Sequence, residues 1–425
     1  MNRDKRVHRR TVLQAAAGTG FFLALSPGFL LTGCDGGVRA TESVTLGLDS
    51  EEYDVELALR ATPDSVSILP GTPSEVWRYK AELLKGPKNT LTENTNSYLG
   101  PTIRLRRGQR VKIHIHNELP EDTTVHWHGL HVPSDVDGQP RLPIQPGETM
   151  TVGFDVWDRA GLFWYHSHAH GERGGRVGFQ SYAGLAGLLI VEDDEEAGGL
   201  LPEPEDRPYA TLAPAQRLDI WLDLSQSQPG STLELISDSF QAGMMGGMGM
   251  MGSNALPLGS RFTLVGLEVA ESLEVNEQLP AQLGQQRQRI LVGSNTRIRT
   301  FELRPVMMRG FAINGRRFEG PHVADDEKVR LGDTEIWEFR NNTPMPHPMH
   351  IHGLQFNIVG RRGGNSDSLQ QGLVDSGWHD TVLVMPRETV QLAMKFERFA
   401  GLFIYHCHNM EHEDAGMMRY FQVQS

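Results

Sequence analysis

An internal repeat constrains this 425-residue chain more than any other feature of its sequence. In the early part of each copy the offset is 224 residues, relating three positions to three others: Gly108, Asn117 and His126 to Gly332, Asn341 and His350. Further along the offset becomes 240, and GLFWYHSH at 161–168 matches GLFIYHCH at 401–408. A repeat of this length indicates two copies of one structural module.

Both copies have the residue pattern of β structure. Val111, Ile113 and Ile115 alternate with polar residues, as in a strand with one buried face. Neither copy contains a long apolar stretch with the helical period of 3.6 residues. Similar short runs, bounded by Gly, Pro and Asn, occur at 335–340, 390–396 and 402–405. We therefore predict an all-β protein with two β-sandwiches, at residues 45–195 and 288–425.

The region between the copies, residues 196–287, is too short for a third sandwich of full size. It begins within an acidic, Pro- and Gly-rich stretch at 192–208 that is typical of a linker. Three pieces beyond it have the composition of strands: 217–224, 232–236 and 261–269. We predict a linker followed by a reduced middle domain.

Four His-x-His pairs occur in the two copies, at 126/128, 166/168, 350/352 and 406/408. In a strand, side chains at i and i+2 point to the same face, so each pair presents two imidazoles together. Imidazole is a preferred ligand of copper, iron and zinc. His114 and His116 alternate with apolar residues and are interpreted as solvated side chains. Four pairs at matching places of a repeat predict a metal centre.

The second copy also contains His347, Cys407, His412 and Met417. Two imidazoles, a thiolate and a thioether are the ligands of a blue-copper electron-transfer site. The alternative, that Cys407 is a buried inert thiol, is disfavoured by its place between two histidines of a predicted metal centre. The corresponding residues of the first copy cannot build such a site: Thr123, Ser167, Glu172 and Val177. Only the second copy is expected to hold an electron-entry metal.

These motifs resemble those of the multicopper oxidases, the family of bacterial laccases and cuprous oxidases. The resemblance rests on HWHG at 126–129, HSH at 166–168, HPMHIHG at 347–353 and HCHNMEHEDAGM at 406–417. It covers both copies and implies cupredoxin-like Greek-key β-sandwiches. Three-domain members have a full middle cupredoxin domain, of which only the late part is recognisable here, at 212–223.

The resemblance also implies four copper ions and their ligands. The type 1 copper would be held by His347, Cys407, His412 and axial Met417. The type 2 copper would be held by His126 and His350. One type 3 copper would take His128, His166 and His408, and the other His168, His352 and His406. The last three ions would form a trinuclear cluster between the copies.

The implied reaction couples one-electron oxidation of Cu(I) or phenolic donors at the type 1 copper to four-electron reduction of dioxygen to water at the cluster. Asp137 and Glu413 match carboxylates that the family uses to relay protons. The alternative for each is a hydrogen-bonded acid outside the metal ligands. His131 and His170 are in excess of the ligand count and are interpreted as neighbouring or surface groups.

A Met-rich segment at 243–252 suggests Cu(I) as a substrate. Thioethers are soft ligands that select Cu(I), and the segment contains Met244, Met245, Met248, Met250 and Met251. Met345, two residues before His347, is a further candidate contact. The alternative is a low-complexity loop without function.

The N-terminal 34 residues are typical of an export signal. Arg9 and Arg10 form a twin-arginine pair, an apolar stretch follows at 15–31, and LTGC ends at Cys34 like a bacterial lipobox. We expect export by the twin-arginine route, a periplasmic or membrane-anchored protein, and a lipid anchor at Cys34. The alternative is a plain signal peptide cut elsewhere.

The charge and the set of candidate ligands also bear on other functions. A net charge of −13 argues against nucleic-acid binding. A copper nitrite reductase would not need the paired His set. A non-enzymatic cupredoxin scaffold should lack ligands, whereas all twelve residues are present. A periplasmic copper-binding protein that stores the metal through the Met-rich segment stays an alternative.

Overall fold

The computed structural model describes residues 43–47, 52–68, 70–95, 97–170, 176–193, 201, 203–224, 226–240, 259–270, 278–283, 288–307, 310–364 and 367–425. The predicted export signal, with Cys34, and the Met-rich segment at 243–252 lie outside these residues and stay predictions. Contacts divide the chain so that residues 222–277 belong to one unit. Residues 42–221 and 278–425 together form the other unit, which contains both copies of the repeat.

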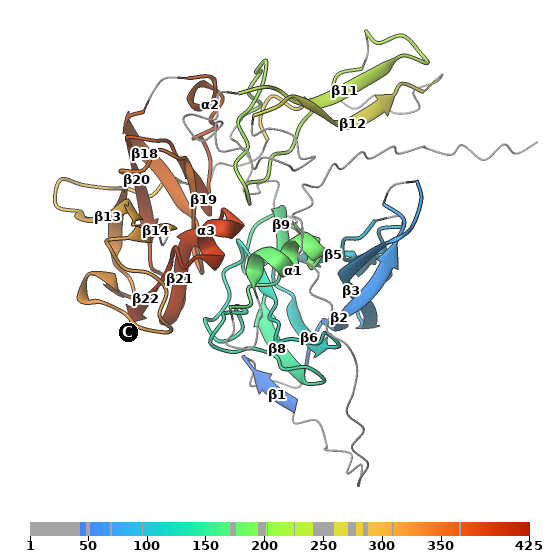
Figure 1. Ribbon diagram of the computed structural model, residues 1–425, viewed down its shortest axis with the longest axis horizontal. Coiled ribbons are helices and arrows are strands. Elements are labelled where there is room, and N and C mark those ends of the chain that lie inside the picture. Colours follow the sequence, from blue (N-terminus) through green and yellow to red (C-terminus); the bar gives the residue numbers. More distant parts are fainter. Residues whose placement is uncertain are drawn as a thin grey trace, which may run out of the picture. The chain divides into compact units, whose positions relative to one another are not determined.

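The first copy forms two five-stranded sheets, coloured blue to green in Figure 1. The order of the first sheet is β1 (Ser43–Leu46), β8 (Thr149–Asp155), β6 (Arg110–Asn117), β2 (Val55–Val66) and β3 (Ser74–Lys85). The second is β4 (Leu91–Thr92), β5 (Thr102–Arg106), β10 (Ala186–Glu192), β9 (Gly161–His166) and β7 (His126–His128). The helices are η1 (Lys88–Thr90) and α1 (Val177–Ala183).

The second copy repeats this arrangement. One sheet has the order β14 (Gly310–Ile313), β13 (Arg297–Val306), β16 (Thr334–Asn341), β20 (Glu388–Lys395) and β18 (Phe356–Gly363). The other has β15 (Lys328–Arg330), β22 (Met418–Gln424), β21 (Gly401–Cys407), β17 (His347–Ile351) and β19 (Thr381–Val384). The helices are η3 (Asp325–Glu327), α2 (Ser368–Gln371) and α3 (Met410–Asp414). Among the described residues, no helix is long and apolar enough to cross a bilayer.

The central strands of the two copies have corresponding partners. β6 pairs parallel to β2 and antiparallel to β8, as β16 pairs parallel to β13 and antiparallel to β20. β9 lies between β7 and β10, as β21 lies between β17 and β22. The prediction of two β-sandwiches from one repeated module is therefore confirmed.

The alternating pattern that predicted β6 matches its burial. Val111, Ile113 and Ile115 are buried in the core of the first sandwich. His114 and His116, on the opposite face, are half-buried and bond to the hydroxyls of Thr151 and Thr149. These two imidazoles therefore lie apart from the four predicted pairs, as expected for a strand with one wet face.

The region between the copies contains one small sheet among its described residues. β11 (Thr232–Ser237) pairs antiparallel to β12 (Phe262–Glu268), in agreement with two of the three expected strands. The third expectation, a strand at 217–224, is wrong, since these residues have no strand pairing. The preceding chain is instead tied to the second sandwich by hydrogen bonds. The hydroxyl of Thr211 donates to the carbonyl of Leu369 and its N–H to that of Gly372, and the Gln216 amide donates to the carbonyl of Thr381.

One asparagine in each copy holds the turn that leads toward the His pairs. The amide of Asn117 donates to the carbonyls of Glu121 and Ile144, and its oxygen accepts from the N–H of Leu119. Asn341 makes the same three bonds, to Met345, Val384 and Thr343. The repeat thus preserves a buried side chain that satisfies backbone groups of a loop.

We expect Asn117→Ala and Asn341→Ala each to lower the free energy of unfolding by about 1–3 kcal/mol, because each change leaves buried backbone groups without a partner. Asn342→Ala, at the exposed neighbouring position, is the control and should change it by less than about 0.5 kcal/mol. Urea denaturation of the metal-free protein measures the three values. Equal stability of Asn341→Ala and Asn342→Ala would contradict the assigned role.

Candidate metal centre

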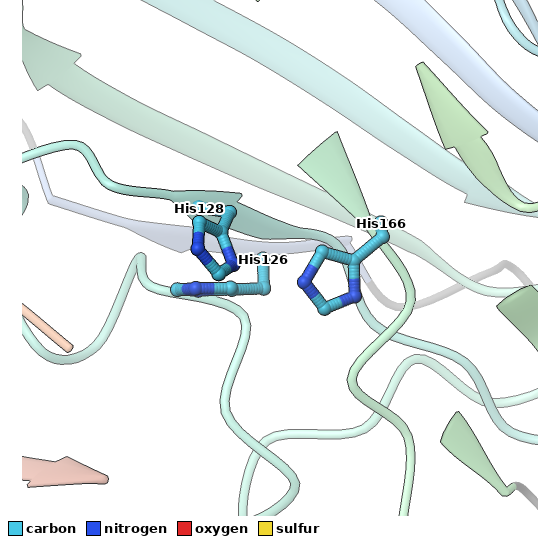
Figure 2. A group of neighbouring side chains, drawn as sticks. All are labelled: His126, His128 and His166. Atoms are coloured by element: carbon cyan, nitrogen blue, oxygen red, sulfur yellow. The ribbon is translucent and has the colours of Figure 1, made fainter. Parts of the chain in front are cut away.

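The strand register brings the four His pairs into one buried cluster. His126 on β7 is opposite His166 at the end of β9, and His350 on β17 is opposite His406 on β21. Figure 2 shows the imidazoles of His126, His128 and His166 gathered beside β7 and β9. Each of the eight imidazoles is at most 1% exposed: His126, His128, His166, His168, His350, His352, His406 and His408.

Imidazole nitrogens from both sandwiches converge within this cluster. The Nε2 atoms of His168 and His352 each lie 3.2 Å from Nε2 of His406. The Nε2 atoms of His126 and His350 lie 3.4 Å apart. His168 and His126 come from the first sandwich, and the other three from the second. Nitrogens that face one another at such distances are placed to share a metal ion.

The remaining three histidines form a third group. The ring centroids of His128, His166 and His408 are 5.0 to 5.6 Å apart. Among the described residues, no hydrogen-bond partner meets Nδ1 of His128, Nε2 of His166 or either nitrogen of His408. Buried polar atoms normally have partners. Unpartnered imidazole nitrogens in this position fit a metal ion.

Asp137 bonds to one histidine of each sandwich. Its carbonyl oxygen lies 2.9 Å from Nδ1 of His126, and its carboxylate Oδ2 lies 2.7 Å from Nδ1 of His352. Both imidazoles are therefore held so that Nε2 faces the centre of the cluster. Burial raises the pKa of Asp137.

Asp380 makes similar contacts with His350 and His128. The sequence did not reveal this residue. Its carbonyl oxygen lies 2.7 Å from Nδ1 of His350, and its carboxylate Oδ1 lies 3.1 Å from Nε2 of His128. Adding either repeat offset to Asp137 gives Arg361 or Gly377, so repeat arithmetic could not find it. The neighbouring Thr381 pairs with His350 in the sheet, a placement that only the structure shows.

Glu413 contacts two other histidines of the cluster, His406 and His168. Its Oε2 is 3.1 Å from Nδ1 of His406, and its Oε1 is 3.4 Å from Nε2 of His168. Burial raises the pKa of Glu413 to about 7. The two predicted carboxylates, Asp137 and Glu413, therefore both contact the cluster.

A second, sulfur-containing site lies in the second sandwich. Sγ of Cys407 is 3.4 Å from Nδ1 of His347 and 3.5 Å from Nδ1 of His412. Met417 is fully buried, donates its N–H to the carbonyl of His412 and accepts from the N–H of Cys407. Because His406 and His408 flank Cys407, three consecutive residues join the sulfur site to the His cluster.

The equivalent space in the first sandwich contains hydrogen-bonded hydroxyls instead. Thr123 and Ser167 both donate to Oε1 of Gln180, at 2.8 and 2.5 Å. Val177 is buried at the start of α1, and Glu172 lies outside the described residues. The expectation that only one copy has the soft-metal residues agrees with this arrangement.

Burial favours the neutral imidazoles that metals bind. It lowers the pKa of His168, His347 and His406 to about 3, and that of His412 to about 4. A neutral imidazole offers a lone pair without first losing a proton. Burial raises the pKa of the Cys407 thiol, whereas a bound cation would favour its thiolate. Imidazoles with one thiol are a donor set that fits copper.

The other sequence candidates lie outside these groups. Met345 is half-buried, and its carbonyl accepts from Asn341 and Thr343. His131 pairs with Asp158 at 2.5 Å, and His170 packs against Phe318. The interpretation of His131 and His170 as neighbouring groups agrees with these contacts.

Comparison with known proteins relates both sandwiches to one family. Two family profiles described as multicopper oxidase match residues 75–196 and 294–425. The chain is 26% identical to the multicopper oxidase mco of Staphylococcus aureus, over 81% of this chain and 86% of the relative. It is 30% identical to a laccase of Bacillus subtilis, over 52% of this chain and 44% of that protein. A multicopper oxidase of Campylobacter jejuni, described as a metallo-oxidase, shares the fold with a TM-score of 0.68 at 21% identity, over 90% and 94% of the two chains.

We expect His352→Ala to weaken Cu(II) binding by the metal-free protein, because it removes one of the three converging Nε2 atoms. Copper-induced stabilisation, followed by thermal unfolding, should fall by about 1.4 kcal/mol for each tenfold loss of affinity. His116→Ala, which removes an imidazole bonded to Thr149, should keep wild-type copper binding. Equal copper content in the two variants would contradict a metal site at the cluster.

Proposed function

Because the chain belongs to the multicopper oxidase family of oxidoreductases, we propose that it couples one-electron oxidation of Cu(I) or phenolic donors to four-electron reduction of dioxygen to water. The observation that supports this most directly is the burial of eight imidazoles in one cluster, joined through Cys407 to a sulfur site. A cluster and a separate electron-entry site are the two parts that such a coupling needs.

Four copper ions would occupy the two sites. His347, Cys407, His412 and Met417 would hold the type 1 ion, and His126 and His350 the type 2 ion. The two type 3 ions would be held by His168, His352 and His406 and by His128, His166 and His408. When bound, copper supplies the one-electron redox chemistry and the affinity for dioxygen that amino-acid side chains lack.

The chain itself contributes a short connection between the sites. Cys407 contacts His347 and His412 through Sγ, while the residues on either side of it, His406 and His408, turn their rings into the cluster. A few covalent bonds therefore separate the two sites. A donor oxidised at the sulfur site need not enter the cluster.

Two carboxylates are placed to handle protons. Glu413, with a pKa of about 7, can hold or release a proton near neutral pH beside His406 and His168. Asp137 is fully buried against His352 and His126. We propose that both transfer protons toward the cluster, as expected from their match to the family.

Two donor classes fit the electron-entry site. Relatives are described both as laccase and as metallo-oxidase. Met345 and the five methionines at 243–252 favour Cu(I), because thioethers select this ion. Export to the periplasm, or to a membrane-anchored place outside the cytoplasm with a lipid on Cys34, stays a prediction from residues 1–34, and cell fractionation of Cys34→Ser tests it.

We expect Cys407→Ser to abolish the blue absorption and the oxidase turnover, because serine cannot supply a copper thiolate bond. Copper bound by the eight histidines should remain, since their rings are held by other contacts. Optical spectra and copper content per chain measure both effects. A blue band that survives the substitution would refute the type 1 assignment.

Oxygen uptake by the copper-loaded protein, with Cu(I) and dimethoxyphenol as separate donors, tests the proposed reaction. We expect fast uptake with Cu(I) and slower uptake with the phenol, with Cys407→Ser as the inactive control. The reverse preference would identify a laccase and leave the methionines without a role. Uptake with neither donor would contradict the enzyme and favour a copper-binding protein.

A further inference from the structure

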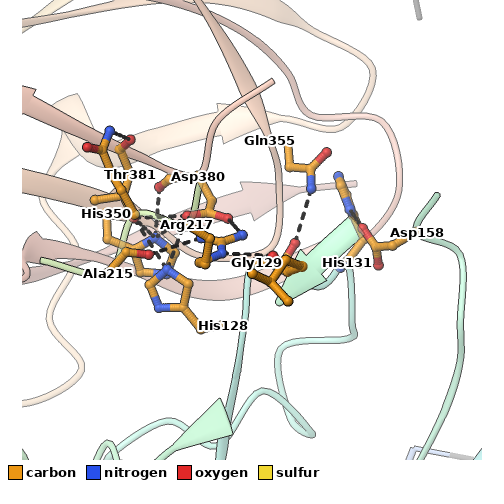
Figure 3. A network of polar contacts seen from close by, with 12 residues as sticks. His128, Gly129, His131, Asp158, Ala215, Arg217, His350, Gln355, Asp380 and Thr381 are labelled. Carbon is orange, nitrogen blue, oxygen red and sulfur yellow. Dashed lines mark hydrogen bonds and ion pairs between the residues drawn. The ribbon is translucent and has the colours of Figure 1, made fainter. Parts of the chain in front are cut away.

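One arginine from the region between the sandwiches reaches the edge of the His cluster. Arg217 donates from Nη1 and Nη2 to the two carboxylate oxygens of Asp380, at 2.7 and 2.6 Å. Its Nε donates to the carbonyl of Leu162, on β9 of the first sandwich, at 2.9 Å. A bidentate Arg–carboxylate pair fixes the orientation of both planar groups. Arg217 therefore contacts both sandwiches at once (Figure 3).

The carboxylate that Arg217 holds is bonded in turn to a metal-site histidine. Oδ1 of Asp380 accepts from the hydroxyl of Thr381 and lies 3.1 Å from Nε2 of His128. Because Nε2 of His128 is engaged there, its Nδ1 is the nitrogen available to the cluster, and it has no hydrogen-bond partner. Figure 3 shows the contacts of Arg217 and His128 meeting at Asp380.

Asp380 offers atoms close to those of His128 and His350 and could itself be considered a metal ligand. Its two oxygens, however, already accept two guanidinium bonds and one hydroxyl bond. Its carbonyl bonds to Nδ1 of His350. Asp380 is better described as an outer group that orients one imidazole of each sandwich, and Arg217 as the group that orients Asp380.

The glycine of the first His-Trp-His-Gly motif leaves room for this pair. A Cβ on Gly129 would lie 2.5 Å from Oδ2 of Asp380 and 3.0 Å from Nη2 of Arg217. Its φ of +90° adds a second reason for glycine. In the second copy the equivalent Gly353 is packed instead against the ring of Phe403. The Arg217–Asp380 pair thus occupies the space that a side chain at position 129 would need.

Asp137, the counterpart of Asp380, bonds to no guanidinium among the described residues. Its Oδ2 bonds to His352. Its Oδ1 lies 3.0 Å from Nδ1 of His126 but makes no hydrogen bond among the described residues. Both aspartates join the two sandwiches through one carbonyl and one carboxylate contact. They differ in that a guanidinium fixes only Asp380.

We propose that Arg217 is a positioning residue for the His cluster: by fixing Asp380, it holds His128 and His350 in the orientation that binds copper. The inference rests on the proposed function and adds to it a role for the region between the sandwiches. Asp380 then serves as a fixed anchor for one imidazole of each sandwich.

The test compares Arg217→Met with Arg361→Met. Arg361 makes a similar bidentate pair, with Asp375 at 2.7 and 2.9 Å, and its other hydrogen bonds go to Leu383 and Glu388. Both variants should lose stability. We expect only Arg217→Met to lose affinity at the cluster, by about 10- to 100-fold, with an altered type 2 signal in electron paramagnetic resonance and an unchanged blue absorption.

Two milder variants keep the test decisive if Arg217→Met fails to fold. Arg217→Lys retains the charge but not the bidentate geometry, and should give an intermediate copper affinity. Asp380→Asn retains an oxygen facing His128 but loses the charge pairing, and should shift the type 2 signal. Full rescue of both properties by Arg217→Lys would overturn the requirement for a fixed guanidinium.

The remaining outcomes separate this inference from the proposed function. Wild-type cluster copper and an unchanged type 2 signal in Arg217→Met would overturn the inference. Parallel loss of blue absorption and cluster copper, as in a general folding defect, would overturn it as well. A wild-type protein that binds no copper at the cluster would instead overturn the proposed function, whatever the variants do.

Discussion

The structure depends on the burial of eight imidazoles where the two sandwiches meet. Each buried nitrogen without a partner costs on the order of 1–3 kcal/mol, and His128, His166, His168 and His408 all have such nitrogens among the described residues. The sheets cannot satisfy these atoms, because the rings lie at or beyond strand ends and face one another. The arrangement becomes favourable when cations bind at the centre and polar groups orient the rings from outside. Asp137, Asp380 and Glu413 supply the outer contacts, so the second requirement is already met by the chain.

Duplication supplied the scaffold, and small local differences made it asymmetric. The central strands have corresponding partners, and Asn117 and Asn341 hold corresponding loops with the same three bonds. At one place the copies diverge completely: a thiol between two imidazoles in the second sandwich, and hydroxyls bonded to Gln180 in the first. The divergence costs the fold little, because each set of side chains is internally satisfied. Two sandwiches of one design therefore differ in one site: only the second has a thiol between two imidazoles, while both contribute histidines to the cluster.

The sequence was sufficient where the relevant information is local. Alternation predicted β6, the i and i+2 rule predicted the facing of each His pair, and constant offsets predicted the second sandwich from the first. Asp380 and Arg217 escaped prediction because neither lies at a repeated position, and their partners are 252 and 163 residues away. The expected strand at 217–224 was wrong for a related reason. Its apolar pattern resembles a strand, but Arg217 directs its side chain to β9 and Asp380, and no neighbouring strand is present among the described residues to continue a sheet.

The contacts of Arg217 also bear on why part of the region between the sandwiches is retained. Residues 203–221 belong to neither of the two main cores, although Ala213 packs with Leu373, Leu383 and Met385 of the second copy. Those residues nevertheless run along the second sandwich, held by Thr211 and Gln216, and end with a guanidinium between β9 and Asp380. Two of these contacts are buried: Ala213 is 4% exposed in a small apolar cluster, and Asp380, the partner of Arg217, is 3% exposed. If Arg217 positions the cluster as proposed, a shorter segment would remove its guanidinium and leave the buried Asp380 carboxylate without that charged partner.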